Sequence, residues 1–355
     1  MKKKYSRISL NKVKLKEIKR KNVNIKRIKK YFIIQRKLQR IIKNNIKISI
    51  VICLLLVYYY IQYIFLVDLQ NFYQSPIVLD INNLNKTKYF FRNLTQVIDN
   101  VTLVSAYFRI PSKHSGSDYS KWVYNFLKIN HTMVFFVDSS CYEEIIYKRP
   151  LEYRNKTIWI KTDITDFYSY KNYYKEFSET YKIDIEKNIH TVPLYLVWAE
   201  KVNFVKIAIE KNYFKSMCFY WIDAGCFRSP GDVQNYINDW PSPEKCFEDG
   251  RVYMSEVLKH SNHFYTRYTN FDIPTHMAMQ RSLSVDGSSF GGRKEYLLRF
   301  RELYYEVLNK FIEHKIFIGK DQNLFSYIAF NNPQVVKLVY FRFFFNLKTI
   351  FFKKK

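Results

Sequence analysis

The strongest chemical signal in the sequence is an acidic residue at the end of an apolar run. Asp223 directly follows Met217 to Ile222 (MCFYWI), a run typical of a buried strand. In open α/β sheets, ligands bind at the carboxyl ends of the strands. A carboxylate there would be a hard oxygen ligand for Mg²⁺ or Mn²⁺ bridging a diphosphate, and Arg228 could pair with phosphate. In the alternative interpretation, Asp223 caps the next turn and Arg228 pairs with it.

Two further polar segments could join such a site. Gly319 to Asn323 (GKDQN) opens an apolar helix, and helix N-termini favour anions and transferred groups. The simpler interpretation makes Asp321 the N-cap and leaves its neighbours solvated. Ser288 to Arg293 (SSFGGR) contains Gly291 and Gly292, which would let the backbone approach a ligand closely. An ordinary turn before the next helix explains these glycines equally well.

Several well-known catalytic signatures are absent from the sequence. It contains no Walker A loop, no HExxH motif and no GxSxG nucleophile elbow. His260 and His263 are three residues apart, but a lone pair at that spacing usually lies on the surface. The sequence therefore does not indicate a P-loop nucleotidase, a zinc protease or a serine hydrolase.

The elements that would position these residues follow the order strand, helix, strand. Val101 to Phe108, Met133 to Asp138 and Thr157 to Lys161 are short apolar runs that predict buried strands. Between the first two, apolar residues at helical spacing follow Ser117 or Asp118, either of which could be the cap. This order predicts a parallel, doubly wound sheet.

Helical spacing of apolar residues recurs further along the chain. Val202 to Ile209 predicts one helix, and Lys294 to Lys315 predicts a long amphipathic helix. A short helix should follow Asp321, and a last strand should begin near Val335. The prolines and glycines of residues 229–250 predict a loop region.

The formal net charge of +27 is unevenly placed along the 355 residues. Residues 1–47 carry 19 Lys and Arg against one acid, Glu17. Residues 48–67 then carry no charge, and as a helix they would span roughly 30 Å, the thickness of a bilayer core. The positive-inside rule places the N-terminus in the cytosol. We therefore expect a type II membrane protein whose basic tail contacts anionic lipid rather than nucleic acid.

Five regions follow from this reading of the sequence. They are a basic cytoplasmic tail (1–47), a transmembrane signal-anchor helix (48–67), a polar, Asn-rich stem (68–100), an α/β domain (101–341) and a basic, aromatic C-terminal tail (342–355). The domain would lie on the far side of the membrane, in the lumen of the Golgi or another secretory compartment.

Sequons and cysteines beyond the span fit that location. A secretory lumen would allow glycosylation of the sequons, although an Asn-rich chain also produces sequons by chance. The four cysteines could form two disulfides in any of three pairings, or remain buried thiols. The sequons are at Asn85, Asn93, Asn100, Asn130 and Asn155, and the cysteines are Cys141, Cys218, Cys226 and Cys246.

Six segments together resemble the HtrL/YibB family, also called WlaTC/HtrL, of proposed glycosyltransferases. Their order and separation fit the family from Val101 to Tyr340. The resemblance implies a GT-A-like fold, which is a Rossmann-like mixed sheet flanked by helices, and a transferase that uses a nucleotide sugar. The segments are VTLVSAYFRI (101–110), VFFVD (134–138), PLYLVWAEKVNFVKIAI (193–209), YWIDAGCFR (220–228), SSFGG (288–292) and IGKDQN (318–323).

The resemblance also implies a role for each site residue. Asp223 would bind the Mn²⁺ or Mg²⁺ that holds the diphosphate, although Gly225 replaces the second acid of an Asp-x-Asp motif. Asp321 and Gln322 would act at the reacting sugar, with Asp321 completing the metal site or serving as the base. The expected donor-binding residues are Tyr107, Arg109, Asp138, Lys201, Arg228, Gly291, Gly292 and Lys320.

Three functions remain as hypotheses at this point. The first is a membrane-anchored glycosyltransferase that moves a sugar from a nucleotide sugar to a glycan or glycoconjugate acceptor. The second is a non-catalytic, membrane-anchored protein that binds glycans with the same fold, which the glycine at position 225 keeps open. The third is a nucleic-acid binder that uses the basic tail.

Overall fold

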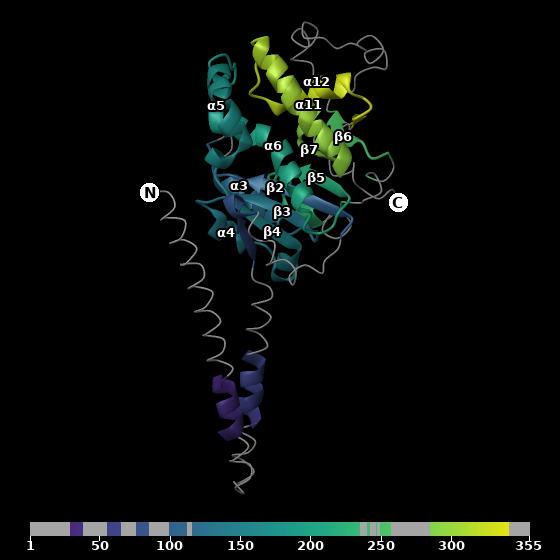
Figure 1. Cartoon of the computed structure of the whole chain (residues 1–355). Helices are drawn as coiled ribbons and strands as arrows, with labels where there is room; N and C mark the ends of the chain where they lie inside the picture. Colours follow the sequence, from purple (N-terminus) through teal and green to yellow (C-terminus); the bar gives the residue numbers. More distant parts are fainter. Residues whose placement is uncertain are drawn as a thin grey trace, which may run out of the picture. The chain divides into compact units, whose positions relative to one another are not determined.

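The computed structural model describes residues 29–37, 55–64, 76–84, 99–111, 116–234, 240–241, 246, 249–256 and 285–340. The chain divides into two compact units, Met1–Tyr73 and Gln74–Lys355 (Figure 1). The first unit contains helices at 29–37 and 55–64, and in it the Gln62 amide donates hydrogen bonds to the hydroxyls of Tyr31 and Tyr58.

The expected membrane span is described only in part. Of residues 48–67, the structure describes 55–64, which are helical. Among the described residues, no helix has the length and apolar character needed to cross a membrane. Most of the basic tail and all of the C-terminal tail (342–355) lie outside the described residues.

The second unit is built on one mixed sheet with strand order β1-β4-β3-β2-β5-β7-β6-β8. Among these strands β7 alone runs antiparallel to its neighbours, β5 and β6. The strands are β1 (Ile77–Asp80), β2 (Val101–Tyr107), β3 (Met133–Asp138), β4 (Thr157–Thr162), β5 (Cys218–Ile222), β6 (Val252–Glu256), β7 (Val285–Arg293) and β8 (Val336–Tyr340).

Helices cover both faces of the sheet (Figure 1). On one face α5, α6, α11 and α12 pack over the alternate strand residues Val104 and Phe136. On the other face α3, α4 and α7 cover Leu103 and Phe135. The helices are α3 (Gly116–Phe126), α4 (Tyr142–Ile146), α5 (Tyr168–Tyr181), α6 (Val192–Lys211), α7 (Pro230–Gln234), α11 (Lys294–Glu313) and α12 (Asp321–Asn331), with short 3-10 helices at Ile81–Asn83, Leu151–Lys156 and Ile164–Asp166.

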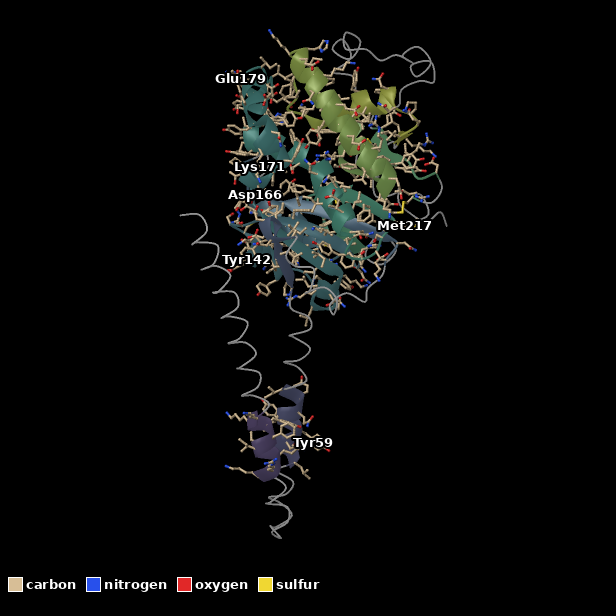
Figure 2. All side chains as sticks on the ribbon, in the orientation of Figure 1. Tyr59, Tyr142, Asp166, Lys171, Glu179 and Met217 are labelled. Atoms are coloured by element: carbon tan, nitrogen blue, oxygen red, sulfur yellow. A yellow bond between two sulfur atoms is a disulfide. The ribbon has the colours of Figure 1, made fainter. Side chains whose placement is uncertain are left out.

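The central helix α6 owes its ends to local sequence. The Thr191 hydroxyl accepts a hydrogen bond from the Leu194 amide, and Pro193 occupies the first turn, where its missing N–H costs nothing. Asn212 ends the helix in the left-handed conformation (φ 38°). Because α6 is buried between the sheet and α5 and α11, its polar residues Glu200 and Lys201 face the interior. In contrast, Lys171 and Glu179 on α5 are exposed (Figure 2).

The expected mixed α/β sheet is confirmed, with three corrections to its parts. Strands β2, β3, β4 and β5 match the predicted runs to within one residue at each end. The stem prediction was wrong at Ile77–Asp80, because these residues pair with β4 as an edge strand. Ser288–Arg293 was interpreted either as a segment that approaches a ligand or as an ordinary turn, but it belongs to β7, and β6 was not predicted.

One disulfide links Cys218 at the start of β5 to Cys246. The sequence alone allowed three pairings of the four cysteines or free thiols, and the structure contains this one bond. Cys141 is buried and Cys226 is partly buried, and neither forms a disulfide.

Candidate active site

The carboxyl ends of β2 and β5 border a cavity of about 710 Å³. The chain passes from β2 to β3 on one side and reaches β5 on the other side of β2, so the strand order reverses at this pair. Such a switch point is where open α/β sheets bind ligands. The lining comes from residues 106–110, the first two turns of α3, parts of residues 186–201 and 221–228, Trp240, residues 286–289 of β7 and residues 320–322.

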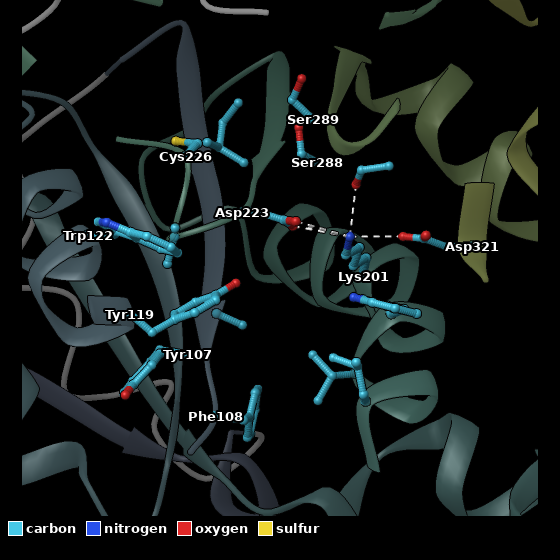
Figure 3. A pocket seen from close by; sticks show the side chains of 18 of the residues that line it. Tyr107, Phe108, Tyr119, Trp122, Lys201, Asp223, Cys226, Ser288, Ser289 and Asp321 are labelled. Atoms are coloured by element: carbon cyan, nitrogen blue, oxygen red, sulfur yellow. Dashed lines mark hydrogen bonds and ion pairs between the residues drawn. The ribbon is translucent and has the colours of Figure 1, made fainter. Parts of the chain in front are cut away.

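Two carboxylates from distant elements meet at Lys201 in this cavity (Figure 3). The Lys201 Nζ lies 3.1 Å from Asp223 Oδ1 and 2.8 Å from Asp321 Oδ2, and it donates a 2.8 Å hydrogen bond to the Gly287 carbonyl. Asp223 follows β5, Asp321 begins α12, and Lys201 lies in the middle of α6. Asp223, Lys201 and Asp321 are called the charged triad below.

Burial and neighbouring charges act in opposite directions on the pKa of Lys201. Burial alone would lower the pKa of the Lys201 ammonium, but the carboxylates of Asp223 and Asp321 outweigh burial and raise that pKa. Burial raises the pKa of Asp223, an effect that Lys201 opposes and Asp321 reinforces. Lys201 is therefore a fixed cation that holds two acidic side chains at one point of the cavity.

The segment Asp286–Gly287 also belongs to the site, although the sequence analysis did not select it. The carboxylate of Asp286 accepts hydrogen bonds from the Ser288 amide and hydroxyl, both at 2.8 Å. Burial raises the pKa of Asp286 to about 6. A Cβ on Gly287 would lie 2.7 Å from Asp321 Oδ2, so a residue without a side chain is needed there.

Aromatic rings form a second wall of the cavity (Figure 3). Tyr107 stacks on Tyr119 with ring centroids 6.1 Å apart, and Tyr119 is 5.4 Å from Trp122. The guanidinium of Arg228 lies 4.7 Å from the Trp122 ring centre. Trp221 donates a 2.7 Å hydrogen bond from Nε1 to Asp223 Oδ1. Rings with a basic group beside them suit a base or a sugar that carries phosphate.

A second polar cluster lies at residues 184–190 and was also missed. Asp184 Oδ2 accepts hydrogen bonds from His190 Nδ1 at 2.8 Å and from the Tyr195 hydroxyl, and Oδ1 accepts one from the Glu186 amide at 2.8 Å. Glu186 itself pairs with Lys320. Asp184, Glu186 and His190 approach one another closely enough for a shared metal ion, but their oxygens already bind protein donors. Glu186 and His190 line the cavity.

The cavity gathers most of the residues selected from the sequence. Three of the selected residues are not among those that line it: Asp138, Gly291 and Gly292. Of those that do, Arg109 also pairs with Glu144 at 2.6 Å. The lining residues expected from the sequence are Tyr107, Arg109, Lys201, Asp223, Arg228, Lys320, Asp321 and Gln322.

Other contacts explain the three residues that do not line the cavity. Asp138 Oδ1 accepts a 2.7 Å hydrogen bond from the Ser140 amide and so caps the turn after β3. Gly291 lies against the Tyr220 ring, where a Cβ would come within 1.9 Å of Cδ1. A Cβ on Gly292 would lie 2.4 Å from the Arg251 carbonyl oxygen. The two glycines therefore make room for packing within the sheet, not for a ligand.

Comparison with known proteins places the chain in a family. Among solved structures, core-mannan synthase A from Aspergillus fumigatus in its Mn/GDP form is similar over 68% of this chain and 72% of that one, with 14% identity. The TM-score of this match is 0.40. No curated protein matches the sequence. The model of the HtrL_YibB family, described as a bacterial protein of unknown function, matches residues 99–352, and the chain belongs to this family.

Proposed function

We propose that the chain is a glycosyltransferase that moves a sugar from a nucleotide sugar to a hydroxyl group of a glycan or glycoconjugate. The observation that carries this proposal is the meeting of Asp223 and Asp321 at Lys201, beside an aromatic wall at the switch point of the sheet. A cavity of about 710 Å³ lies within the usual range for small-molecule sites, roughly 300–1,000 Å³.

Asp223 fits a divalent cation held by a single protein carboxylate. Its side chain is 26% exposed, against 6% for Asp321, and its Oδ2 has a long contact of 3.4 Å with Lys201. A Cβ on Gly225 would lie 3.1 Å from the Tyr119 ring, so a second acid at that position would have little room. Diphosphate oxygens and water would complete the coordination. When bound, such a cation offsets the charge that builds on the leaving diphosphate.

The remaining residues bind and orient the two substrates. The stacked Tyr107 and Tyr119 offer a surface for the base or sugar of the donor. Arg228 can reach the diphosphate from its position over Trp122. Lys201 fixes Asp321 through the 2.8 Å ion pair, so that Asp321 can accept a hydrogen bond from a sugar hydroxyl at a defined position.

The proposal includes anchoring by residues 48–67, with the domain in the lumen of the secretory pathway. The disulfide between Cys218 and Cys246 supports this location, because such bonds persist in oxidising compartments. In sealed microsomes, protease should leave the second unit intact and remove the tail. Cleavage of the second unit in unopened vesicles would contradict this orientation.

A thermal-shift screen of the full-length chain tests the proposed activity. The probes are UDP-glucose, UDP-galactose, UDP-N-acetylglucosamine and GDP-mannose, each with and without Mn²⁺. A nucleotide sugar that binds the folded state stabilises it by mass action and so raises Tm. At a free concentration of 100 times Kd, the free energy of unfolding increases by about 2.7 kcal/mol. The same nucleotide sugar should then release nucleoside diphosphate, and EDTA should suppress this release. Binding of glycans without turnover of any nucleotide sugar would favour a non-catalytic glycan-binding protein instead.

A further inference from the structure

The pair Asp184–His190 has the geometry of an oriented imidazole. His190 Nδ1 lies 2.8 Å from Asp184 Oδ2, and the two side chains are 9% and 1% exposed. The His190 ring packs edge-on against Trp198 at 5.3 Å and against Tyr195 at 6.1 Å. The ring is therefore held by a hydrogen bond on one side and by aromatic packing on others.

The hydrogen bonds of Asp184 decide which nitrogen of His190 carries the proton. The Glu186 amide and the Tyr195 hydroxyl both donate to this carboxylate. Burial would raise the pKa of Asp184, but the hydrogen bonds from Tyr195, Glu186 and His190 outweigh burial and lower it. An ionised carboxylate only accepts, so Nδ1 of the neutral imidazole must donate. The proton therefore resides on Nδ1, and Nε2 is left with an acceptor lone pair.

His190 and the charged triad line the same cavity. Within the described part of the chain, the one hydrogen bond of the His190 imidazole is made through Nδ1. The segment that leads into Asp321 connects the two clusters. Lys320 pairs with Glu186, and a Cβ on Gly319 would lie 2.8 Å from the Tyr195 ring. The imidazole is thus tied to the same short segment that supplies Asp321.

Asp321 is poorly placed to remove a proton itself. Its Oδ2 binds Lys201 at 2.8 Å, its Oδ1 accepts a 2.8 Å hydrogen bond from the Gln322 amide, and its side chain is 6% exposed. Both oxygens of this carboxylate are therefore already engaged by protein donors. A side chain with an unoccupied acceptor is better suited to take the proton of the incoming hydroxyl.

We propose that His190 is the general base of the transfer and that Asp184 is its positioning residue, an inference that rests on the proposed function. The acceptor O–H gives its proton to Nε2 while the oxygen forms a bond to the anomeric carbon of the donor sugar. The bond from that carbon to the diphosphate oxygen breaks, and the nucleoside diphosphate leaves with the electron pair. A direct displacement of this kind inverts the anomeric configuration.

The test measures turnover by the full-length chain of the nucleotide sugar that gives the largest thermal shift, with a panel of methyl hexosides or water as acceptor. His190→Asn should lower kcat by about 10²- to 10⁴-fold and leave the affinity for the nucleoside diphosphate within threefold. Asp184→Asn should also lower kcat, because an amide can donate to Nδ1 and move the proton to Nε2. His131→Asn is the matched control. His131 is half-buried, with its Nδ1 3.6 Å from Asp99, but does not line the cavity, so kcat should stay within threefold.

The outcomes separate this assignment from the proposed function. If the wild-type chain turns over a nucleotide sugar and His190→Asn keeps a kcat within threefold of it, the role of His190 is overturned and the proposed function stands. Retention of configuration in the product would overturn it as well. Absence of turnover by the wild-type chain would overturn the proposed function and the base together. If His190→Asn does not fold, the kcat values of His190→Gln and Asp184→Asn are compared with that of the wild type instead.

Discussion

The Lys201 ammonium and the Asp321 carboxylate lie 2.8 Å apart, although 120 positions separate them in the chain. Lys201 is also 3.1 Å from Asp223, so one largely buried cation pairs with two acids. We expect Lys201→Met to lower the free energy of unfolding by about 3–5 kcal/mol, because it leaves the buried Asp321 and the partly buried Asp223 without a cation. Urea denaturation followed by fluorescence measures this, since all five tryptophans lie between positions 122 and 240.

The matched control for this change is Lys206→Met on the same helix. Lys206 is 34% exposed and pairs with Glu210 at 2.6 Å, four residues along α6. An exposed pair of this kind contributes less than about 1 kcal/mol. Adding Asp223→Asn and Asp321→Asn to Lys201→Met should recover part of the lost unfolding free energy, because these two changes remove the carboxylate charges that Lys201→Met leaves unpaired. An equal loss for Lys206→Met and Lys201→Met would show that the charged triad is not a stabilising unit.

Asp223→Ala should abolish transfer and leave the fold intact. Asp223 is the more exposed carboxylate of the charged triad, and the ion pair of Lys201 with Asp321 survives its removal. The loss of electrostatic stabilisation at the leaving diphosphate should reduce kcat by at least about 10²- to 10³-fold. Release of nucleoside diphosphate measures turnover, and circular dichroism reports the fold. Asp138→Ala, another acid at a strand end but outside the cavity, should keep wild-type turnover. Wild-type turnover by Asp223→Ala would disprove its role.

The sequence predicted the parts of the fold that depend on local patterns. β2, β3, β4 and β5 are buried on both faces, and such strands read as uninterrupted apolar runs. Asp223 could be selected because it directly follows such a run. Asp321 could be selected because it opens an apolar helix. In both cases the signal and the functional residue are neighbours in the chain.

Other parts of the fold depend on contacts that no local pattern records. β7 contains Gly287, Gly291 and Gly292, whose positions are set by Asp321, Tyr220 and Arg251 from other elements, so the segment resembled a turn. β1 is only four residues long and gains its partner from β4. The pair Asp184–His190 lies in a polar stretch without periodicity. It becomes a candidate site only because α6 and the start of α12 bring it to the cavity.

Gly287→Ala tests how closely the sheet approaches the charged triad. The added Cβ would lie 2.7 Å from Asp321 Oδ2, and the ion pair with Lys201 prevents that carboxylate from moving away freely. We expect a loss of about 1–3 kcal/mol in the free energy of unfolding, together with reduced turnover. Gly231→Ala is the control, since the nearest atom to its Cβ would be 3.9 Å away, and its effect should stay within about 0.5 kcal/mol. Unchanged stability and turnover in Gly287→Ala would mean that Asp321 is free to move.

Asp286 and Asp249 should make the free energy of unfolding depend on pH in opposite directions. Burial raises the pKa of Asp286 to about 6 from an ordinary 3.8, so the folded chain holds this proton more tightly than the unfolded chain. Its contribution to stability is complete below pH 4 and is lost as the pH rises through 6. The unfolding free energy of Asp286→Asn, relative to wild type, should therefore increase by roughly 1–3 kcal/mol between pH 4 and pH 7.

Asp249→Asn should show the opposite dependence in the same denaturation experiment. Burial would raise the pKa of Asp249, but hydrogen bonds from Arg251, Lys337 and Tyr253 outweigh burial and lower it. Its contribution to stability is present above the pKa of the unfolded chain and is lost as the pH falls further. Asp249→Asn should therefore be less stable than wild type at pH 7, and the difference should shrink in acid. Parallel curves for the two variants would show that burial and hydrogen bonding do not act on these two carboxylates in opposite directions.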